Sequence, residues 1–152
     1  MGVLSENIIM GSAGASTGPD SDTLLLIHSD TTNGSTDFVD SSSDGRTITA
    51  VGQVHHDTGQ KKFGATAIYC DGSDDEITIP DSGDWAFTDE FTVDFWIYFN
   101  GTPANNTHIC GQGTSSAATY AFMFRCEASG NFIAATSNGS TQRIITSSTD
   151  MS

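Results

Sequence analysis

Six carboxylates lie in the seventeen residues YCDGSDDEITIPDSGDW at positions 69–85, which makes this segment the first candidate for chemistry. Carboxylate and carbonyl oxygens are the ligands that Ca²⁺ prefers. An EF-hand loop beginning at Asp71 would require glycine where Glu76 stands and a carboxylate where Ser82 stands. The segment is therefore not an EF-hand.

Two interpretations of the acidic segment remain. Asp71, Asp74 and Asp75 could form a calcium site of another kind within a turn. Alternatively, Asp and Gly occupy these positions because they tolerate tight turns and because aspartate side chains cap nearby backbone amides. We expect no cofactor, and Ca²⁺ is the one ion that the sequence leaves open.

The sequence contains no convincing pair of carboxylates for acid–base catalysis. A retaining glycosidase needs two carboxyl groups roughly 5 Å apart, for example at positions i and i+2 on one face of a strand. In FTVDFWIYF, the face that carries Asp94 has Thr92 and Trp96 as its neighbours, so it offers a single carboxylate. The sequence also contains no GxSxG, HExxH or P-loop motif. We therefore predict that the protein is not an enzyme.

The same strand offers a candidate binding surface. Asp94, Trp96 and Tyr98 alternate with apolar residues, so their side chains are expected on one face. Aromatic rings beside a carboxylate can stack on a sugar and hydrogen-bond its hydroxyl groups. An equally good alternative is that Trp96 and Tyr98 lie under a loop or at a contact between subunits, where such residues are also favoured.

Charge excludes two classes of partner. The chain has 19 acidic and five basic residues, which gives a net charge of −14. Nucleic-acid binding depends on Lys and Arg contacts to phosphate, and anionic membranes require cationic groups as well. No segment approaches the roughly 20 consecutive apolar residues of a membrane-spanning helix. We predict neither a nucleic-acid nor a membrane partner.

Composition and periodicity predict an all-β fold. The 152 residues suffice for one domain with a core, and the abundance of Gly, Ser and Thr favours short strands joined by turns over helices. The clearest strand is FTVDFWIYF at 91–99, in which the odd-numbered residues are apolar and are predicted to face the core. Trp85 and Phe87, just before it, are predicted core anchors.

The N-terminal residues differ in composition from the rest. Residues 1–22 combine one apolar patch with GSAGASTGPDSD, a sequence that does not fold by itself. We predict a flexible N-terminal arm over 1–22 and a folded domain over 23–152. The arm is either a leader without function or an anchor, in which Ile8, Ile9 and Met10 dock on a neighbouring protein.

The order of the motifs resembles a known family. FGATAIYCDG, IPDSGDW and FTVDFW follow one another with plausible gaps, and the similarity extends over residues 23–99. This resembles the laminin-G-like branch of the concanavalin A-like lectin/glucanase superfamily, in versions common in structural proteins of tailed bacteriophages. The resemblance implies an antiparallel jelly-roll β-sandwich.

Two features depart from that family. Members usually continue beyond the position of Ile144 with a block that supplies the last strands of the sandwich. The domain is then either a shortened version or one whose unpaired edge is completed by a neighbouring chain. The second departure is Glu76, where members commonly have an aromatic or apolar residue.

The resemblance suggests two functions. The first is a non-enzymatic protein on the surface of a phage virion, made in the host cytoplasm: a capsid decoration or head-fibre protein held by its N-terminal arm. Its partners would be capsid or other virion proteins and further copies of itself, with a trimer as the first hypothesis. The alternative is a receptor-recognition module of a tail fibre or spike that binds cell-surface glycans.

Overall fold

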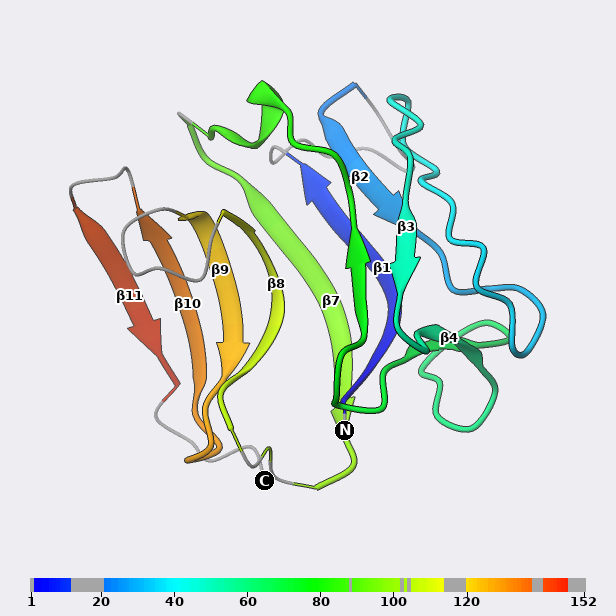
Figure 1. Ribbon diagram of the computed structural model, residues 1–152. Coiled ribbons are helices and arrows are strands. Elements are labelled where there is room, and N and C mark those ends of the chain that lie inside the picture. Colours follow the sequence, from blue (N-terminus) through cyan, green and yellow to red (C-terminus); the bar gives the residue numbers. More distant parts are fainter. Residues whose placement is uncertain are drawn as a thin grey trace. The chain divides into compact units, whose positions relative to one another are not determined.

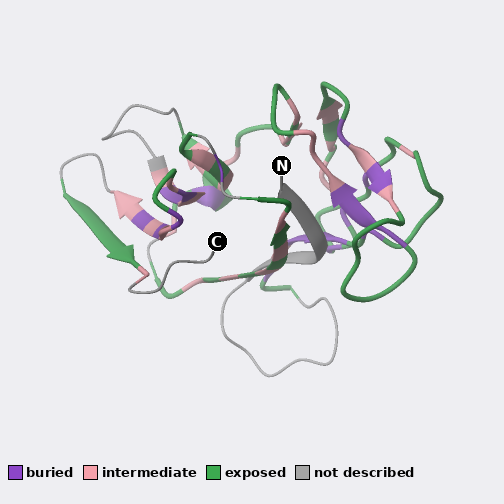
Figure 2. Ribbon diagram, turned by 90° about the horizontal axis from the view of Figure 1, so that it is seen from below, coloured by how far each residue is buried: buried purple, intermediate pink, exposed green. Residues whose placement is uncertain are grey.

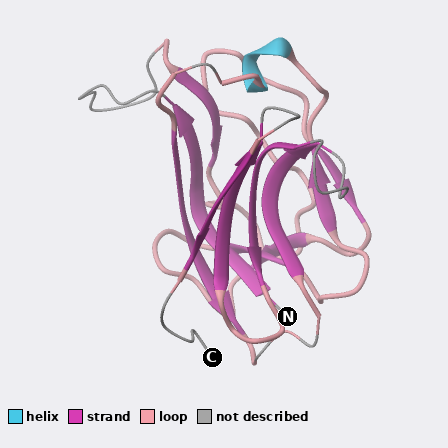
Figure 3. Ribbon diagram, turned by 90° about the vertical axis from the view of Figure 1, so that its left-hand side faces the viewer, coloured by secondary structure: helices cyan, strands magenta, loops and turns pink. Residues whose placement is uncertain are grey.

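The computed structural model divides the chain into two units, residues 1–100 and 101–152, which we describe separately. It describes residues 2–11, 21–87, 89–101, 103, 105–113, 120–137 and 141–147. Within these residues every paired strand is antiparallel, and the only helical element is the short 3₁₀ turn η1 (Gly83–Trp85), shown in Figure 3. The predicted all-β antiparallel class is confirmed.

The first unit is built on a five-stranded sheet around β1 (Gly2–Gly11), shown in Figure 1. One edge of β1 pairs with β7 (Thr92–Phe99). The other edge pairs with β2 (Thr23–Ile27) along its C-terminal half and with β5 (Ala67–Tyr69) along its N-terminal half. The sheet continues from β5 to β4 (His55–Asp57).

A two-stranded sheet completes the paired structure of this unit. It joins β3 (Thr49–Val51) to β6 (Glu76–Thr78), the strand inside the acidic segment. After β6 the chain reaches η1, where the Ser82 hydroxyl accepts a hydrogen bond from the Asp84 amide. Trp85 is 5% exposed, as predicted for a core anchor, whereas Phe87 is only half-buried and stacks on Phe91.

The second unit is a four-stranded meander. Its strands follow the order β11 (Gln142–Thr146), β10 (Phe132–Ser137), β9 (Tyr120–Cys126) and β8 (Thr107–Gly113). Met123, Ile133 and Ala135 form its buried cluster. Among the described residues β11 pairs only with β10, and it is exposed along its whole length (Figure 2).

β7 confirms the predicted alternation of faces. Its even-numbered residues are exposed and its odd-numbered residues are more buried. Residues such as Phe95 and Ile97 remain half-buried, however, so they are less enclosed than the core residues we expected. The buried apolar residues described in this sheet lie on β2 and β5 and include Leu25, Ile27 and Ile68.

Residues 2–11 fall within the segment 1–22 for which we predicted a flexible arm. These residues form β1, whose main chain pairs on both edges with strands distant in sequence. Sequence reasoning judged the segment alone, whereas a strand is stabilised mainly by its cross-strand partners. The main chain of Ile8, Ile9 and Met10 pairs with β2, so this patch belongs to the sheet, and its proposed role as an anchor remains a prediction. Residues 12–20 lie outside the described part of the chain.

Candidate functional site

Strand register places the candidate binding residues on one face of the first unit's sheet. Tyr98 and Tyr69 both pair with Val3, and His55 pairs with Tyr69, so one row crosses β7, β1, β5 and β4. Opposite residues of antiparallel strands share a face. Tyr98, Tyr69 and His55 therefore lie on the same side of the sheet, together with the other even-numbered residues of β7.

The next row defines the opposite face. Ile97 and Ile68 both pair with Leu4, and His56 pairs with Ile68. Ile68 is 2% exposed and His56 is 1% exposed. This second face is therefore the interior of the unit, and the row that contains Tyr98 faces outward.

The outward face carries a group of exposed aromatic rings. Trp96 is 50% exposed, Tyr98 48% and Phe63 52%. The ring of Phe63 meets that of Trp96 edge to face, with centroids 6.0 Å apart, and the ammonium of Lys62 lies 4.6 Å from the centre of the Trp96 ring. We call Phe63, Trp96 and Tyr98, with Lys62 and Asp94 beside them, the outer aromatic face.

This face can bind a ligand but has little means to transform one. Half-exposed aromatic rings present flat apolar surface, and the Tyr98 hydroxyl and Asp94 carboxylate supply polar contacts. The structure brings together all three residues that the sequence predicted. Phe63 and Lys62 were missed, because they belong to the loop between β4 and β5 and no local pattern signals that this loop reaches Trp96.

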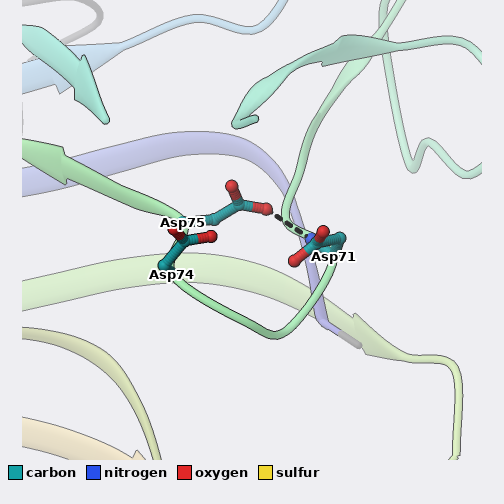
Figure 4. A group of neighbouring side chains, drawn as sticks. All are labelled: Asp71, Asp74 and Asp75. Atoms are coloured by element: carbon teal, nitrogen blue, oxygen red, sulfur yellow. Dashed lines mark hydrogen bonds between the residues drawn. The ribbon is translucent and has the colours of Figure 1, made fainter. Parts of the chain in front are cut away.

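The second candidate site is the acidic turn (Figure 4). Asp71, Asp74 and Asp75 each offer a carboxylate oxygen, and these atoms lie within 4.8 Å of one another. Both oxygens of Asp75 accept backbone hydrogen bonds, from the amides of Gln53 and Asp71, each at 2.5 Å. The Asp71 carboxylate accepts a bond from the Ser73 amide at 2.8 Å.

These hydrogen bonds give the acidic turn a structural role. Asp75 connects the turn after β3 to the turn before β6, and Gly52 is required beside it. A Cβ at Gly52 would lie 2.6 Å from the Asp75 carboxylate and 2.8 Å from the Asp74 carbonyl oxygen, and φ at Gly52 is +76°. The capping interpretation accounts for Asp71 and Asp75 without an ion, and calcium binding by the three carboxylates remains a prediction.

A third acidic group stabilises the loop after β2. Asp40 is 6% exposed and accepts hydrogen bonds from the amides of Leu26, Ser42 and Arg46 and from the Ser42 hydroxyl. Burial is the largest influence on this carboxyl and opposes its ionisation, but the hydrogen bonds together outweigh it and lower the pKa of Asp40. The carboxylate is thus an internal cap.

Arg46 extends this loop to the IPDSGDW motif. Its guanidinium hydrogen-bonds Asp44 and Asp84, at 2.5 and 2.7 Å, and lies 4.6 Å from the centre of the Trp85 ring. Its Nε donates to the carbonyl of Leu24 at 3.0 Å. The motif is therefore a structural signature, because its Asp and Trp hold the arginine of a distant loop.

A buried serine and histidine resemble a catalytic pair without its access. The Ser29 hydroxyl lies 2.6 Å from Nδ1 of His56, whose Nε2 donates to the Asp37 carbonyl at 3.1 Å. Ser29 is 0% exposed and His56 1%, so no substrate reaches them. Burial lowers the pKa of His56 and so favours the neutral ring, and it outweighs the opposing effect of the hydrogen bond to the Asp37 carbonyl.

Two of the three cysteines, Cys70 and Cys110, have thiols that are not activated as nucleophiles. Burial, with the Asp75 and Asp71 carboxylates, raises the pKa of Cys70 to about 11. Burial raises the pKa of Cys110 to about 12. Both thiols are therefore protonated at neutral pH and are poor nucleophiles.

The described residues thus form an antiparallel all-β domain whose first unit carries an exposed aromatic face. Comparison with known proteins identifies the family: the model of the concanavalin A-like lectin/glucanases superfamily, of the laminin G type, matches residues 71–152, more than half of the chain. The chain belongs to this superfamily, as its motifs indicated. No curated protein and no solved structure matches it. The described residues include no helix long and apolar enough to cross a membrane.

Proposed function

We propose that this protein is a non-catalytic carbohydrate-binding domain and that the outer aromatic face is its binding surface. One observation carries the proposal: three aromatic side chains, each about half exposed, gather on one outward face of the sheet. The superfamily is compatible with this role. The proposal rests on the fit between these rings and the apolar faces of sugars.

Physical chemistry favours a sugar as the ligand of such a face. Aromatic rings left half in water represent apolar surface that a ligand can cover, and pyranose rings have flat C–H faces that match them. The face also has polar groups at its margin, the Tyr98 hydroxyl and the Asp94 carboxylate. Such groups fix the orientation of a ligand through its hydroxyl groups.

Several observations support a binding role without catalysis. Asp94 has Thr92 and Trp96 as its neighbours on its face of β7, so the strand offers one carboxylate where a glycosidase needs two. The Ser29–His56 pair is buried, and the Cys70 and Cys110 thiols are protonated. Domains of this kind are typically binding modules.

A glycan array, followed by calorimetry with the best ligand, tests the proposal. We expect Trp96→Ala to weaken binding by about fivefold or more, since one stacked aromatic ring contributes roughly 1 kcal/mol or more. Val39→Ala is the control, because Val39 is 64% exposed, lies on the loop between β2 and β3 and is not one of the residues of the outer aromatic face. The proposal fails if no glycan binds, or if Trp96→Ala and Val39→Ala bind equally well.

We further propose that the domain is displayed on a bacteriophage particle as an oligomer. The motif order supports the phage origin, and β11 supports assembly, because Ile144 and Ile145 on this edge strand are 56% and 74% exposed. An exposed apolar edge strand is a ready template for pairing with another chain. A decoration or head-fibre protein that forms a trimer would cover this edge with a neighbouring copy, and a fibre or spike module would use the same assembly.

Sedimentation of the wild-type protein and of Ile145→Lys tests the assembly. We expect an oligomer that the substitution converts to monomer, with an unchanged circular dichroism spectrum. A wild-type monomer would contradict the oligomer proposal. Labelled virions imaged at low resolution would then separate head from tail, and absence of label from particles would exclude a virion protein.

A further inference from the structure

We propose that the outer aromatic face recognises sugars that carry a protonated amine, such as deacetylated amino-sugar polymers. This inference rests on the proposed carbohydrate-binding function and names its ligand class. It starts from the ammonium of Lys62, which lies 4.6 Å from the centre of the Trp96 ring. The protein itself thus places an alkylammonium group on this ring, the same chemical group that a protonated amino sugar presents.

The charge of the protein favours a cationic ligand. The chain has 19 acidic and five basic residues, a net charge of −14, so its long-range field attracts cations and repels polyanions. On β7 the exposed Asp94 precedes Trp96 by two residues on the same face. An amine bound over Trp96 could form a charge-assisted hydrogen bond with this carboxylate. An acidic polysaccharide would meet the opposite electrostatics.

A bound ligand could displace the Lys62 ammonium from the face of the Trp96 ring. Lysine is a flexible side chain with a compact, strongly hydrated charge, and an exposed cation–π contact is weak. The loop that carries Lys62 also brings Phe63 edge to face with Trp96, at 6.0 Å between centroids. The sugar's ammonium would therefore replace that of Lys62, and Lys62 acts as a built-in competitor for the ring.

Lys61 provides a matched control within the same loop. Its ammonium donates to the carbonyl of Thr58 at 3.2 Å, whereas that of Lys62 lies over Trp96. Lys61→Gln and Lys62→Gln remove the same charge from adjacent positions. Only the second substitution uncovers the ring, so the difference between the two variants measures competition for Trp96 rather than net charge.

The experiment uses two hexasaccharides of equal length, one of glucosamine and one of N-acetylglucosamine. Calorimetry is carried out at about pH 6, where the amine is protonated and ordinary carboxyl groups, with pKa near 4, are ionised. We expect the glucosamine oligomer to bind at least about tenfold more tightly than the acetylated one. Added salt should weaken the binding of the glucosamine oligomer alone.

The variants complete the test. Lys62→Gln should tighten glucosamine binding about two- to fivefold, more than Lys61→Gln does. Asp94→Asn should weaken it about fivefold or more and weaken the acetylated oligomer less, because the asparagine amide can still bond a hydroxyl group but cannot pair with an ammonium. Thermal melting of each variant verifies that it is folded.

The outcomes separate this inference from the function on which it rests. Equal or tighter binding of the acetylated oligomer would overturn the amine specificity while glycan binding stands. Weaker glucosamine binding by Lys62→Gln would also overturn it, because it would show that Lys62 assists the ligand. If neither oligomer binds, the inference fails, and the glycan array decides separately whether the domain binds any sugar.

Discussion

The two tryptophans of this protein make the same kind of contact in different surroundings. In each case a cation lies 4.6 Å from the centre of the indole ring: Arg46 over Trp85 and Lys62 over Trp96. Trp85 is 5% exposed, however, and Trp96 is 50% exposed. The distance alone therefore does not reveal what each pair does.

The surroundings of the cation make the difference. Arg46 is fixed by two carboxylates and by the carbonyl of Leu24, so its planar guanidinium has one orientation over Trp85. The ammonium of Lys62 instead lies over an exposed ring on the outward face. A cation–aromatic pair held on several sides is part of the fold, whereas we propose that the exposed pair exchanges its cation for a ligand.

Replacing each tryptophan gives the largest predicted contrast. We expect Trp85→Ala to lower the free energy of unfolding by about 3–5 kcal/mol, because it removes a buried aromatic ring and leaves a cavity. Trp96→Ala should lower it by about 1 kcal/mol or less, since the ring is half in water already. Urea denaturation of both variants measures the two values. Equal decreases in the free energy of unfolding would show that Trp96 stabilises the fold as a core residue does. That result would contradict the difference we infer between the two tryptophans.

Asp40 and Asp94 extend the contrast to carboxylates. Asp40 accepts four hydrogen bonds from the loop after β2, whereas Asp94 is exposed on the outer aromatic face. We expect Asp40→Asn to lower the free energy of unfolding by about 2–3 kcal/mol, because charge-assisted bonds to buried amides are lost. Asp94→Asn should change it by no more than about 0.5 kcal/mol.

The pH dependence of the Asp40 effect provides a second measurement. The folded pKa of Asp40 is lowered, so its stabilisation is present above the ordinary carboxyl pKa of about 3.9 and is lost as the pH falls below it. The difference between wild type and Asp40→Asn should therefore shrink below about pH 4. A constant difference over that range would contradict the role of the ionised carboxylate.

The adjacent histidines on β4 lie on opposite faces. Protonation of the inner one, His56, should destabilise the folded state. Burial lowers the pKa of His56, so the unfolded chain binds this proton more readily than the folded chain does. The free energy of unfolding should fall as the pH is lowered from the ordinary histidine value of about 6.5. Urea denaturation at several pH values should show that the free energy of unfolding depends less on pH for His56→Gln than for wild type. The same pH dependence in both proteins would mean that His56 is not the responsible group.

Local patterns in the sequence predicted some of these features well. The alternation in β7 and the burial of Trp85 depend on residues close in sequence, and the structure has both. The outward position of Asp94, Trp96 and Tyr98 followed from the same period of two. These are the features for which neighbouring residues carry the information.

Features that depend on distant pairing could not be predicted in this way. β1 was expected to be flexible, because its partners on β2, β5 and β7 are not visible in its own composition. Lys62 and Phe63 meet Trp96 only through the folding of a loop onto the sheet. Arg46 meets Trp85 in a similar way, and the IPDSGDW motif gives no sign of the arginine that it holds. Non-local contacts of this kind define both the structural pair and the candidate site.

Replacing the two cations with glutamine sharpens the comparison at its smallest scale. We expect Arg46→Gln to lower the free energy of unfolding by about 1–2 kcal/mol, since the Asp44 and Asp84 carboxylates and the Leu24 carbonyl lose their common donor. Lys62→Gln should change it by no more than about 0.5 kcal/mol, because the contacts of an exposed cation contribute little to stability. The ligand measurement should reverse this order, since only Lys62 covers a ring that a sugar can reach. Equal destabilisation by Lys62→Gln and Arg46→Gln would show that both cation–aromatic pairs are structural contacts. That result would contradict the proposed role of Trp96 as a binding residue.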